Sequence, residues 1–131
     1  MDKWEPGEEV RSLIREYGGC IRGYASMELY LKTEFLTESK WWMLGLTVNE
    51  HTVIFDPAVK HKLPVDQAYI IYHELTHVAQ FRDFGWVGFM GTYLGQWFRS
   101  GLSYQKMKER GLEKEAIQQS NDFRARCMGD A

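Results

Sequence analysis

The chain has 131 residues, which is enough for one domain with a single hydrophobic core. A hydrophobic content of 44% and an aromatic content of 15% exclude a disordered chain, and the net charge of −2 argues against a nucleic-acid-binding protein. The charged N-terminus lacks a signal peptide, and no uncharged stretch is long enough to cross a bilayer, so we expect a cytoplasmic protein. Cys20 and Cys127 show no CxxC spacing and are expected to be free thiols.

The N-terminal part of the chain contains two predicted elements. Residues 8–17 are typical of a short amphipathic helix, with Val10, Leu13 and Ile14 facing inward and two glycines ending it. From Met27 to Phe35 apolar and polar residues alternate, which predicts a strand with one solvent-facing side. The same residues would also suit a helix.

A β-hairpin is predicted next, from residues 41–48 and 51–55, which are joined by a tight turn at Asn49-Glu50. Because the second strand directly precedes the next helix, we expect His51 to Phe55 to be a sheet edge that binds an extended substrate through backbone hydrogen bonds. Trp41 and Trp42 are expected to pack in the core or at the edge, with the lining of a substrate groove as the alternative.

Three helices are predicted in the remainder of the chain. The first runs from about Val65 to Arg82, the second covers residues 84–100, and the third starts near Gly111 and continues past Phe123. Five apolar residues follow the helical period in the first of them: Ala68, Ile71, Leu75, Val78 and Ala79. Residues 1–131 are therefore predicted to form one α+β domain, a small antiparallel sheet of about three strands packed against this helix and two further C-terminal helices.

The first of these helices carries an HExxH motif, in which His73 and His77 flank Glu74. Residues four apart lie on one face of a helix, so both imidazoles can reach one metal ion at about 2 Å. Glu74 would project beside them, where it could hold a water molecule and accept its proton. The motif is short enough to occur by chance, but the uncharged residues around it are unlike a solvated helix face, and the pattern indicates a zinc hydrolase site.

A catalytic zinc ion needs a third protein ligand, and no further histidine follows the motif. Two carboxylates near the start of the last predicted helix are candidates. Glu113 shares a face with Ala116 and Ser120, small residues that suit contact with the motif helix, whereas the face of Glu115 looks solvated. The helical phase favours Glu113 as the ligand and leaves Glu115 as the alternative.

At these two segments the sequence resembles the gluzincin metallopeptidases, in particular the minigluzincins and small HExxH relatives of the CAAX-type peptidases. The resemblance rests on His-Glu-Leu-Thr-His-Val-Ala-Gln at 73–80, on Tyr104 and on Leu-Glu-Lys-Glu-Ala at 112–116. It implies a sheet whose edge strand binds the substrate, Zn²⁺ held by His73, His77 and Glu113, and Glu74 as the general base. One departure is Ile117, which stands where the related pattern has an aspartate that orients a ligand histidine.

The function expected from this resemblance is zinc-dependent hydrolysis of a peptide or protein substrate. The alternatives are a catalytically idle zinc-binding domain and a partner-binding domain on a peptidase-like scaffold. Tyr104 and His51 are candidates for stabilising the oxyanion, although an ordinary loop aromatic and an ordinary turn histidine are the simpler interpretations. His61 is expected to be a solvated loop residue.

Two further segments leave alternatives open. The aromatic residues between Phe81 and Phe98 are expected to pack in the core, with Gly88, Gly91 and Gly95 allowing close helix contact, rather than to form a membrane-surface patch. The C-terminal tail after Arg124 carries the Cys127 thiol and a carboxylate. Either group could occupy the open zinc position and keep the enzyme latent, with an ordinary frayed terminus as the simpler alternative.

Overall fold

The computed structural model describes residues 1–39, 43–103, 106 and 111–129. The fold is α+β, as the sequence predicted, with a four-stranded sheet in the order β1-β4-β6-β5 and a separate β2-β3 hairpin. In chain order the elements are β1 (Asp2–Lys3), α1 (Glu8–Tyr17), β2 (Cys20–Ile21), β3 (Tyr24–Ala25), α2 (Ser26–Leu31), β4 (Glu34–Thr37), β5 (Gly45–Asn49), β6 (Thr52–Phe55), the 3₁₀ helix η1 (Pro57–His61), α3 (Pro64–Arg99) and α5 (Gly111–Cys127).

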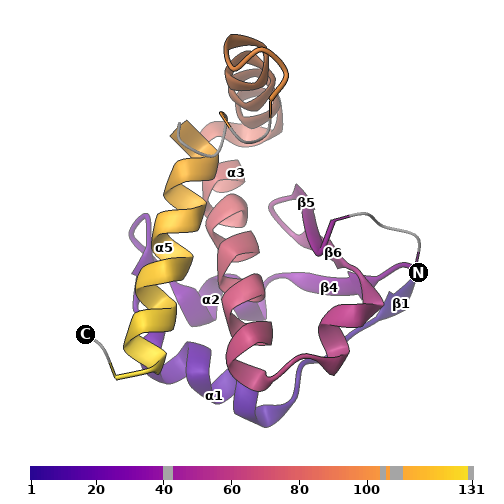
Figure 1. Cartoon of the computed structure of the whole chain (residues 1–131), viewed down its shortest axis with the longest axis vertical. Coiled ribbons are helices and arrows are strands. Elements are labelled where there is room, and N and C mark those ends of the chain that lie inside the picture. Colours follow the sequence, from indigo (N-terminus) through magenta and orange to yellow (C-terminus); the bar gives the residue numbers. More distant parts are fainter. Residues whose placement is uncertain (40–42, 104–105, 107–110, 130–131) are drawn as a thin grey trace.

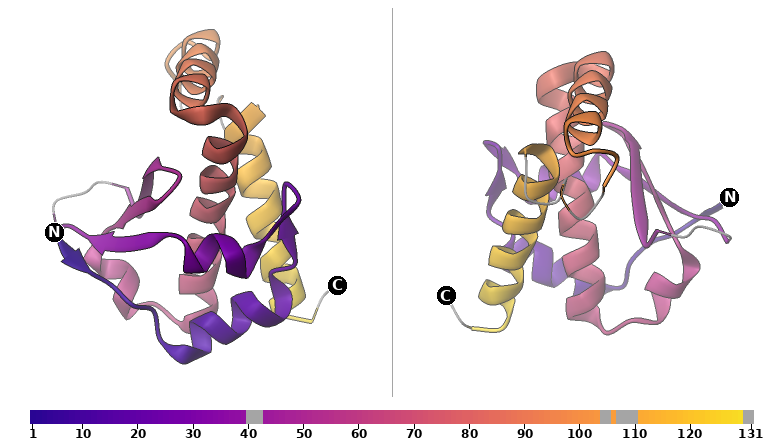
Figure 2. Two further views of the ribbon diagram at one scale, coloured as in Figure 1. Left: turned by 180° about the vertical axis from the view of Figure 1, so that it is seen from behind. Right: turned by 45° about the horizontal axis from the view of Figure 1, so that its top comes forward.

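The long helix α3 is the centre of the molecule (Figure 1 and Figure 2). The four-stranded sheet lies on one side of it, and α5 runs antiparallel to it on the other. Contacts between Tyr69 and Asn121 and between Asp66 and Arg124, each 2.8 Å long, join the start of α3 to the end of α5. Because α5 descends along α3, its first turn lies beside the middle of α3, where the HExxH motif is.

The part of α3 that carries the HExxH motif is packed against the sheet, the N-terminal helices and α5. The five apolar residues that the sequence placed on one helical face are all fully buried. They join a core that includes Ile14 of α1, Leu29 of α2, Val53 and Phe55 of β6, and Phe123 of α5. Pro64 occupies the first turn of α3, where its missing N–H has no role, and Asp66 places a negative charge near the positive end of the helix dipole.

Among the described residues no helix has the length and apolar content to cross a bilayer.

The strand predicted from Met27 to Phe35 is wrong in its first part. Residues 26–31 form helix α2, and only Glu34–Thr37 form a strand, β4. Ser26, Leu29 and Tyr30 are buried at helical spacing, whereas Leu31, which the alternation placed inward, is 73% exposed. A Lys32–Glu28 ion pair of 3.1 Å, four residues apart, further supports the helix. The helical alternative that the same residues allowed is therefore the correct one here.

The predicted hairpin is present, but its second strand is not a sheet edge. β6 pairs with β5 in antiparallel fashion on one side and with β4 in parallel fashion on the other, so the sheet is mixed and has four strands. The sequence Val53-Ile54-Phe55 is buried throughout, as expected for a strand covered on both faces. Within the part of the chain that is described, β5 pairs with β6 alone, which makes β5 one edge of the sheet, with β1 at the other. Trp41 and Trp42 lie outside the described residues.

Helix α3 is interrupted at Gly85, whose φ of 72° and ψ of 168° are not helical. A residue with a side chain rarely adopts a positive φ, so glycine permits the break at this point. The break divides α3 into residues 64–84, called the motif helix below, and residues 86–99, called the arm. The two predicted helices are thus confirmed, and most of the arm extends beyond the sheet at one end of the molecule (Figure 1).

The aromatic residues of this region are only partly buried, so the prediction of core packing is partly wrong. Phe81 and Phe89 are buried and pack with Leu112 of α5. Trp86 and Phe98, in contrast, are 57% and 69% exposed. A Cβ added at Gly91 or Gly95 would meet no atom within 4 Å, so these two glycines do not serve close helix contact.

Candidate metal centre

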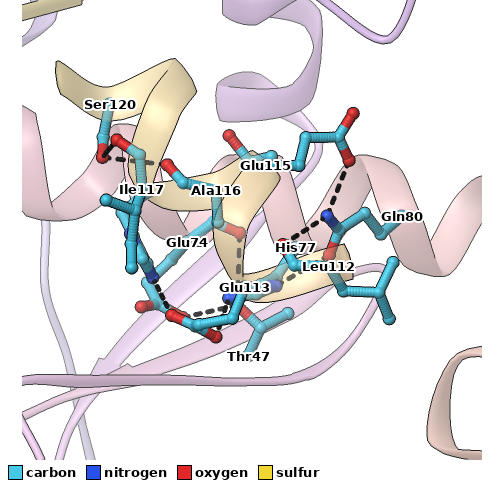
Figure 3. A network of polar contacts seen from close by, with 12 residues as sticks. Thr47, Glu74, His77, Gln80, Leu112, Glu113, Glu115, Ala116, Ile117 and Ser120 are labelled. Carbon is cyan, nitrogen blue, oxygen red and sulfur yellow. Dashed lines mark hydrogen bonds and ion pairs between the residues drawn. The ribbon is translucent and has the colours of Figure 1, made fainter. Parts of the chain in front are cut away.

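Glu74 and His77 project from the motif helix toward the first turn of α5 and the edge strand β5 (Figure 3). His73 precedes His77 by about one helical turn on the same face of the motif helix. The helical repeat brings the two imidazole rings to a centroid distance of 5.1 Å with their planes at 76°. His77 and Glu74 are 7% and 6% exposed, while the side chain of His73 is 18% exposed. His73 is therefore the member of the motif that remains most open to solvent.

Glu113 completes a group of three possible metal ligands. Its carboxylate lies 3.0 Å from Nε2 of His73 and 3.2 Å from Nε2 of His77. One donor atom from each of the three residues lies within 4.8 Å of the other two. Donors held about 2 Å from one tetrahedral ion are themselves roughly 3–3.5 Å apart, and both histidine–carboxylate distances lie in this range, so the set could hold a metal ion.

The electrostatics of the three groups are strongly coupled. Burial disfavours the charged form of His77, but the hydrogen bond to Glu113 and the negative charges of Glu74 and Glu113 outweigh it and raise the pKa of His77 to about 9. Burial acts to raise the pKa of Glu113, yet the hydrogen bonds from His73 and His77 and their charges hold it well below its usual range. The centre therefore favours a negative carboxylate surrounded by positive charge, which either protons or a metal cation can supply.

Glu115, the alternative ligand, is not at the centre. Both of its carboxylate oxygens accept from Nη1 of Arg22, at 2.7 and 2.9 Å, and Oε1 also accepts from Gln80 at 2.7 Å. Its side chain is 30% exposed, so the expectation of a purely solvated residue is also wrong. The helical phase argument nevertheless selected the carboxylate that lies beside the two histidines, and Ala116 and Ser120 on the same face of α5 are fully buried.

The sequence did not identify the residues that hold Glu74. The Thr47 hydroxyl of β5 lies 2.9 Å from Oε1 of Glu74 and 3.2 Å from its carbonyl oxygen, so it can donate to either. Two residues earlier, β5 passes so close that a Cβ on Gly45 would lie 3.1 Å from Cγ of Glu74. A glycine at position 45 therefore lets the edge strand approach the carboxylate, which is directed by Thr47.

Gln80 contacts the second ring nitrogen of His77. Nδ1 of His77 lies 2.8 Å from Oε1 of Gln80, while Nε2 of Gln80 donates to the Leu112 carbonyl at 2.9 Å and to Glu115 (Figure 3). Since both amide hydrogens are engaged, Oε1 must accept, and Nδ1 of His77 carries the proton. This leaves Nε2 of His77 directed at Glu113. Only the position of Gln80, three residues after His77, could have suggested this contact.

The residues predicted to stabilise an oxyanion are not brought to the centre. His51 lies in the turn between β5 and β6, and its 65% exposed side chain faces Glu50. Tyr104 lies outside the described residues. His61 is exposed at the end of η1, as expected.

Tyr93 of the arm is linked to the centre through Phe89, which the sequence did not indicate. Its ring stacks on Phe89 at 5.8 Å, and Phe89 meets the ring of His77 edge-to-face at 5.9 Å. Burial, together with the negative charges of Glu113 and Glu74, raises the pKa of Tyr93 to about 12. Its phenol therefore keeps its proton at neutral pH.

The Cys127 thiol cannot occupy the metal position. α5 is continuous from Gly111 to Cys127, which places Cys127 about 20 Å along the helix from Glu113. Its side chain packs against the main core instead, and burial raises the pKa of the thiol. The latency hypothesis is therefore wrong for the thiol, while residues 130–131, with the carboxylate of the tail, lie outside the described residues. Both cysteines are free, as predicted.

Within the described residues, the centre combines two imidazoles and a buried carboxylate with an adjacent second carboxylate, Glu74, outside this group of three. No protein-family model, no curated protein and no solved structure matches this chain.

Proposed function

We propose that the protein is a zinc-dependent peptidase in which His73, His77 and Glu113 hold the metal ion. The observation that carries the proposal is the convergence of Nε2 of both histidines on the Glu113 carboxylate, at 3.0 and 3.2 Å, with Glu74 beside them. Glu113 comes from a different helix, so this convergence is independent of the HExxH spacing itself.

Bound zinc would supply Lewis acidity, lowering the pKa of water toward 7 and polarising a scissile carbonyl. Glu74 would accept the proton of the attacking water and return it to the leaving amine. The hydrogen bond from Thr47 holds one oxygen of Glu74 and leaves the other for this transfer. Gln80 keeps the proton of His77 on Nδ1, which reserves Nε2 for the metal.

Edge strand β5 is the best candidate for binding the substrate. It contacts Glu74 through Gly45 and Thr47, and it pairs only with β6 among the described residues. An extended peptide added to its free side would therefore run past the general base. Trp86 of the arm donates from Nε1 to the Val48 carbonyl at 3.2 Å, which places an exposed aromatic ring beside the same strand.

Two measurements test this function together. Elemental analysis of the purified protein should give one zinc per chain. The Glu74→Gln variant should retain zinc and its fold while losing about 10²- to 10⁴-fold in activity on any peptide that the wild type cleaves.

The two outcomes of this test separate the candidate functions. If the wild type binds zinc but cleaves nothing in a peptide library, the chain is an idle zinc-binding domain. If it contains no metal, the centre is structural and the proposal fails.

A further inference from the structure

We propose that Arg22, in the turn between β2 and β3, is a positioning residue for the metal ligand His77 and acts through Glu115 and Gln80. The inference rests on the proposed metal centre and adds to it a residue from a distant hairpin. Four side chains form the path, and each contact in it is a hydrogen bond of 2.9 Å or shorter.

The first contact determines which nitrogen of His77 can bind a metal. Gln80 is fully buried, and its amide has three partners within 3 Å. If the amide turned by 180°, Nε2 would face His77 and Oε1 would face two oxygens. His77 would then have to accept at Nδ1 and carry its proton on Nε2, the nitrogen that faces Glu113. The amide orientation therefore selects the tautomer that can bind a metal.

The second contact opposes that rotation. The Leu112 carbonyl and the Glu115 carboxylate are both acceptors, so either would repel the oxygen of a turned amide. The carboxylate is the stronger acceptor because it is charged. The Glu115 carboxylate can oppose the rotation only while it stays 2.7 Å from Nε2 of Gln80. The Glu115 side chain is long and partly exposed, so another group must hold the carboxylate there.

Arg22 holds Glu115 in this position. Its Nη1 donates to both carboxylate oxygens of Glu115, and its Nε donates to Oδ2 of Asp83 at 2.5 Å. The Arg22 guanidinium also lies 5.0 Å above the ring of Phe84. Asp83 is in turn held by the Tyr24 hydroxyl at 2.7 Å. The guanidinium is therefore fixed between the last turn of the motif helix and the first turn of α5.

The backbone supports this placement. Arg22 has a φ of +52°, in the left-handed region that residues with side chains seldom occupy. A glycine would be the usual residue at such a turn position, and Gly23 follows directly. Arg22 thus has an unfavourable backbone conformation, while its side chain makes one ion pair with Asp83 of α3 and another with Glu115 of α5.

Loss of the Arg22 side chain should lower the affinity for zinc and have little effect on folding stability. An ion pair between partly exposed side chains contributes little to stability. Loss of a partner that orients a metal ligand typically lowers metal affinity about 10- to 100-fold. Arg22→Met should therefore reduce zinc affinity by about 10-fold or more while the melting temperature changes little.

Competition against a chromophoric zinc chelator measures this effect in the full chain. Arg124→Met is the matched control, because the Arg124–Asp66 pair of 2.8 Å also joins α5 to α3 but lies at the far end of both helices. Arg22→Lys should recover part of the affinity. The double variant Arg22→Met with Gln80→Leu should bind zinc no more weakly than Gln80→Leu alone, because both changes interrupt one path.

The outcomes distinguish this inference from the proposed function. Wild-type protein that binds no zinc removes both. Zinc binding that is unchanged in Arg22→Met, equally weakened in Arg124→Met, or additively weakened in the double variant overturns the role of Arg22 and leaves the metal centre intact.

Discussion

The two halves of α3 differ in environment although both are rich in apolar residues. In the motif helix, Ala68, Ile71, Leu75 and Val78 are fully buried between the sheet and α5. In the arm, Val87, Leu94 and Phe98 recur at helical spacing and are 79%, 48% and 69% exposed. The difference teaches that helical periodicity identifies an apolar face, whereas the neighbouring elements decide whether that face is buried. The predictions below test this contrast.

The largest expected effect is on metal binding, which involves the motif helix and α5 but no ligand from the arm. Loss of an outer partner of a metal ligand typically lowers affinity about 10- to 100-fold, and this is the range expected for Glu115→Gln. Glu113→Gln removes a ligand charge, so its zinc affinity should fall further. Chelator competition compares the two variants. If Glu115→Gln alone lost the metal, the ligand assignment would be wrong.

Zinc should also stabilise the motif helix selectively. At a free concentration about 1,000 times the Kd, a bound ligand adds about 4 kcal/mol to the free energy of unfolding. Hydrogen exchange should then show greater protection of residues 64–84 with zinc than with chelator. The arm, which carries none of the ligands, should change less. Equal changes in both halves would contradict the contrast.

Core packing should be the next largest difference. Leu75→Ala removes a fully buried side chain and should lower the free energy of unfolding by about 2–5 kcal/mol. Leu94→Ala makes the same chemical change at a site that is 48% exposed, and it should lie within about 0.5 kcal/mol of wild type. Denaturant unfolding measures both. A large loss for Leu94→Ala would mean that the exposed face of the arm is covered in solution.

The smallest expected effects come from two glycines. Gly45→Ala should push Glu74 away from Thr47, because the added Cβ would lie 3.1–3.2 Å from the Glu74 side chain, and peptidase activity should fall without loss of zinc. Gly91→Ala meets open space on the arm and should instead raise the free energy of unfolding by about 0.5–1 kcal/mol without changing activity. A fully active Gly45→Ala would show that the close approach of β5 has no role in catalysis.

The sequence by itself determined the features that depend on local spacing. The four-residue interval puts His73 and His77 on one helical face, and the phase of the last helix distinguishes Glu113 from Glu115. The α+β class, the first helix and the hairpin follow from periodicity and turn residues in the same way. These predictions need only the geometry of one element at a time.

Only the tertiary structure decided which segments lie beside these residues. The edge strand of the hairpin is β5 and not β6, because β4 pairs with β6 on its other side. Thr47 reaches Glu74, and Gln80 and Arg22 complete the surroundings of His77, through contacts between elements far apart in the chain. Alternation at residues 27–31 predicted a strand where the structure has a helix, because so short a segment fits the period of either one. The neighbouring elements that bury one face of the helix decide between the two. Which side chains meet across different elements depends on how those elements pack, and local periodicity does not predict that packing.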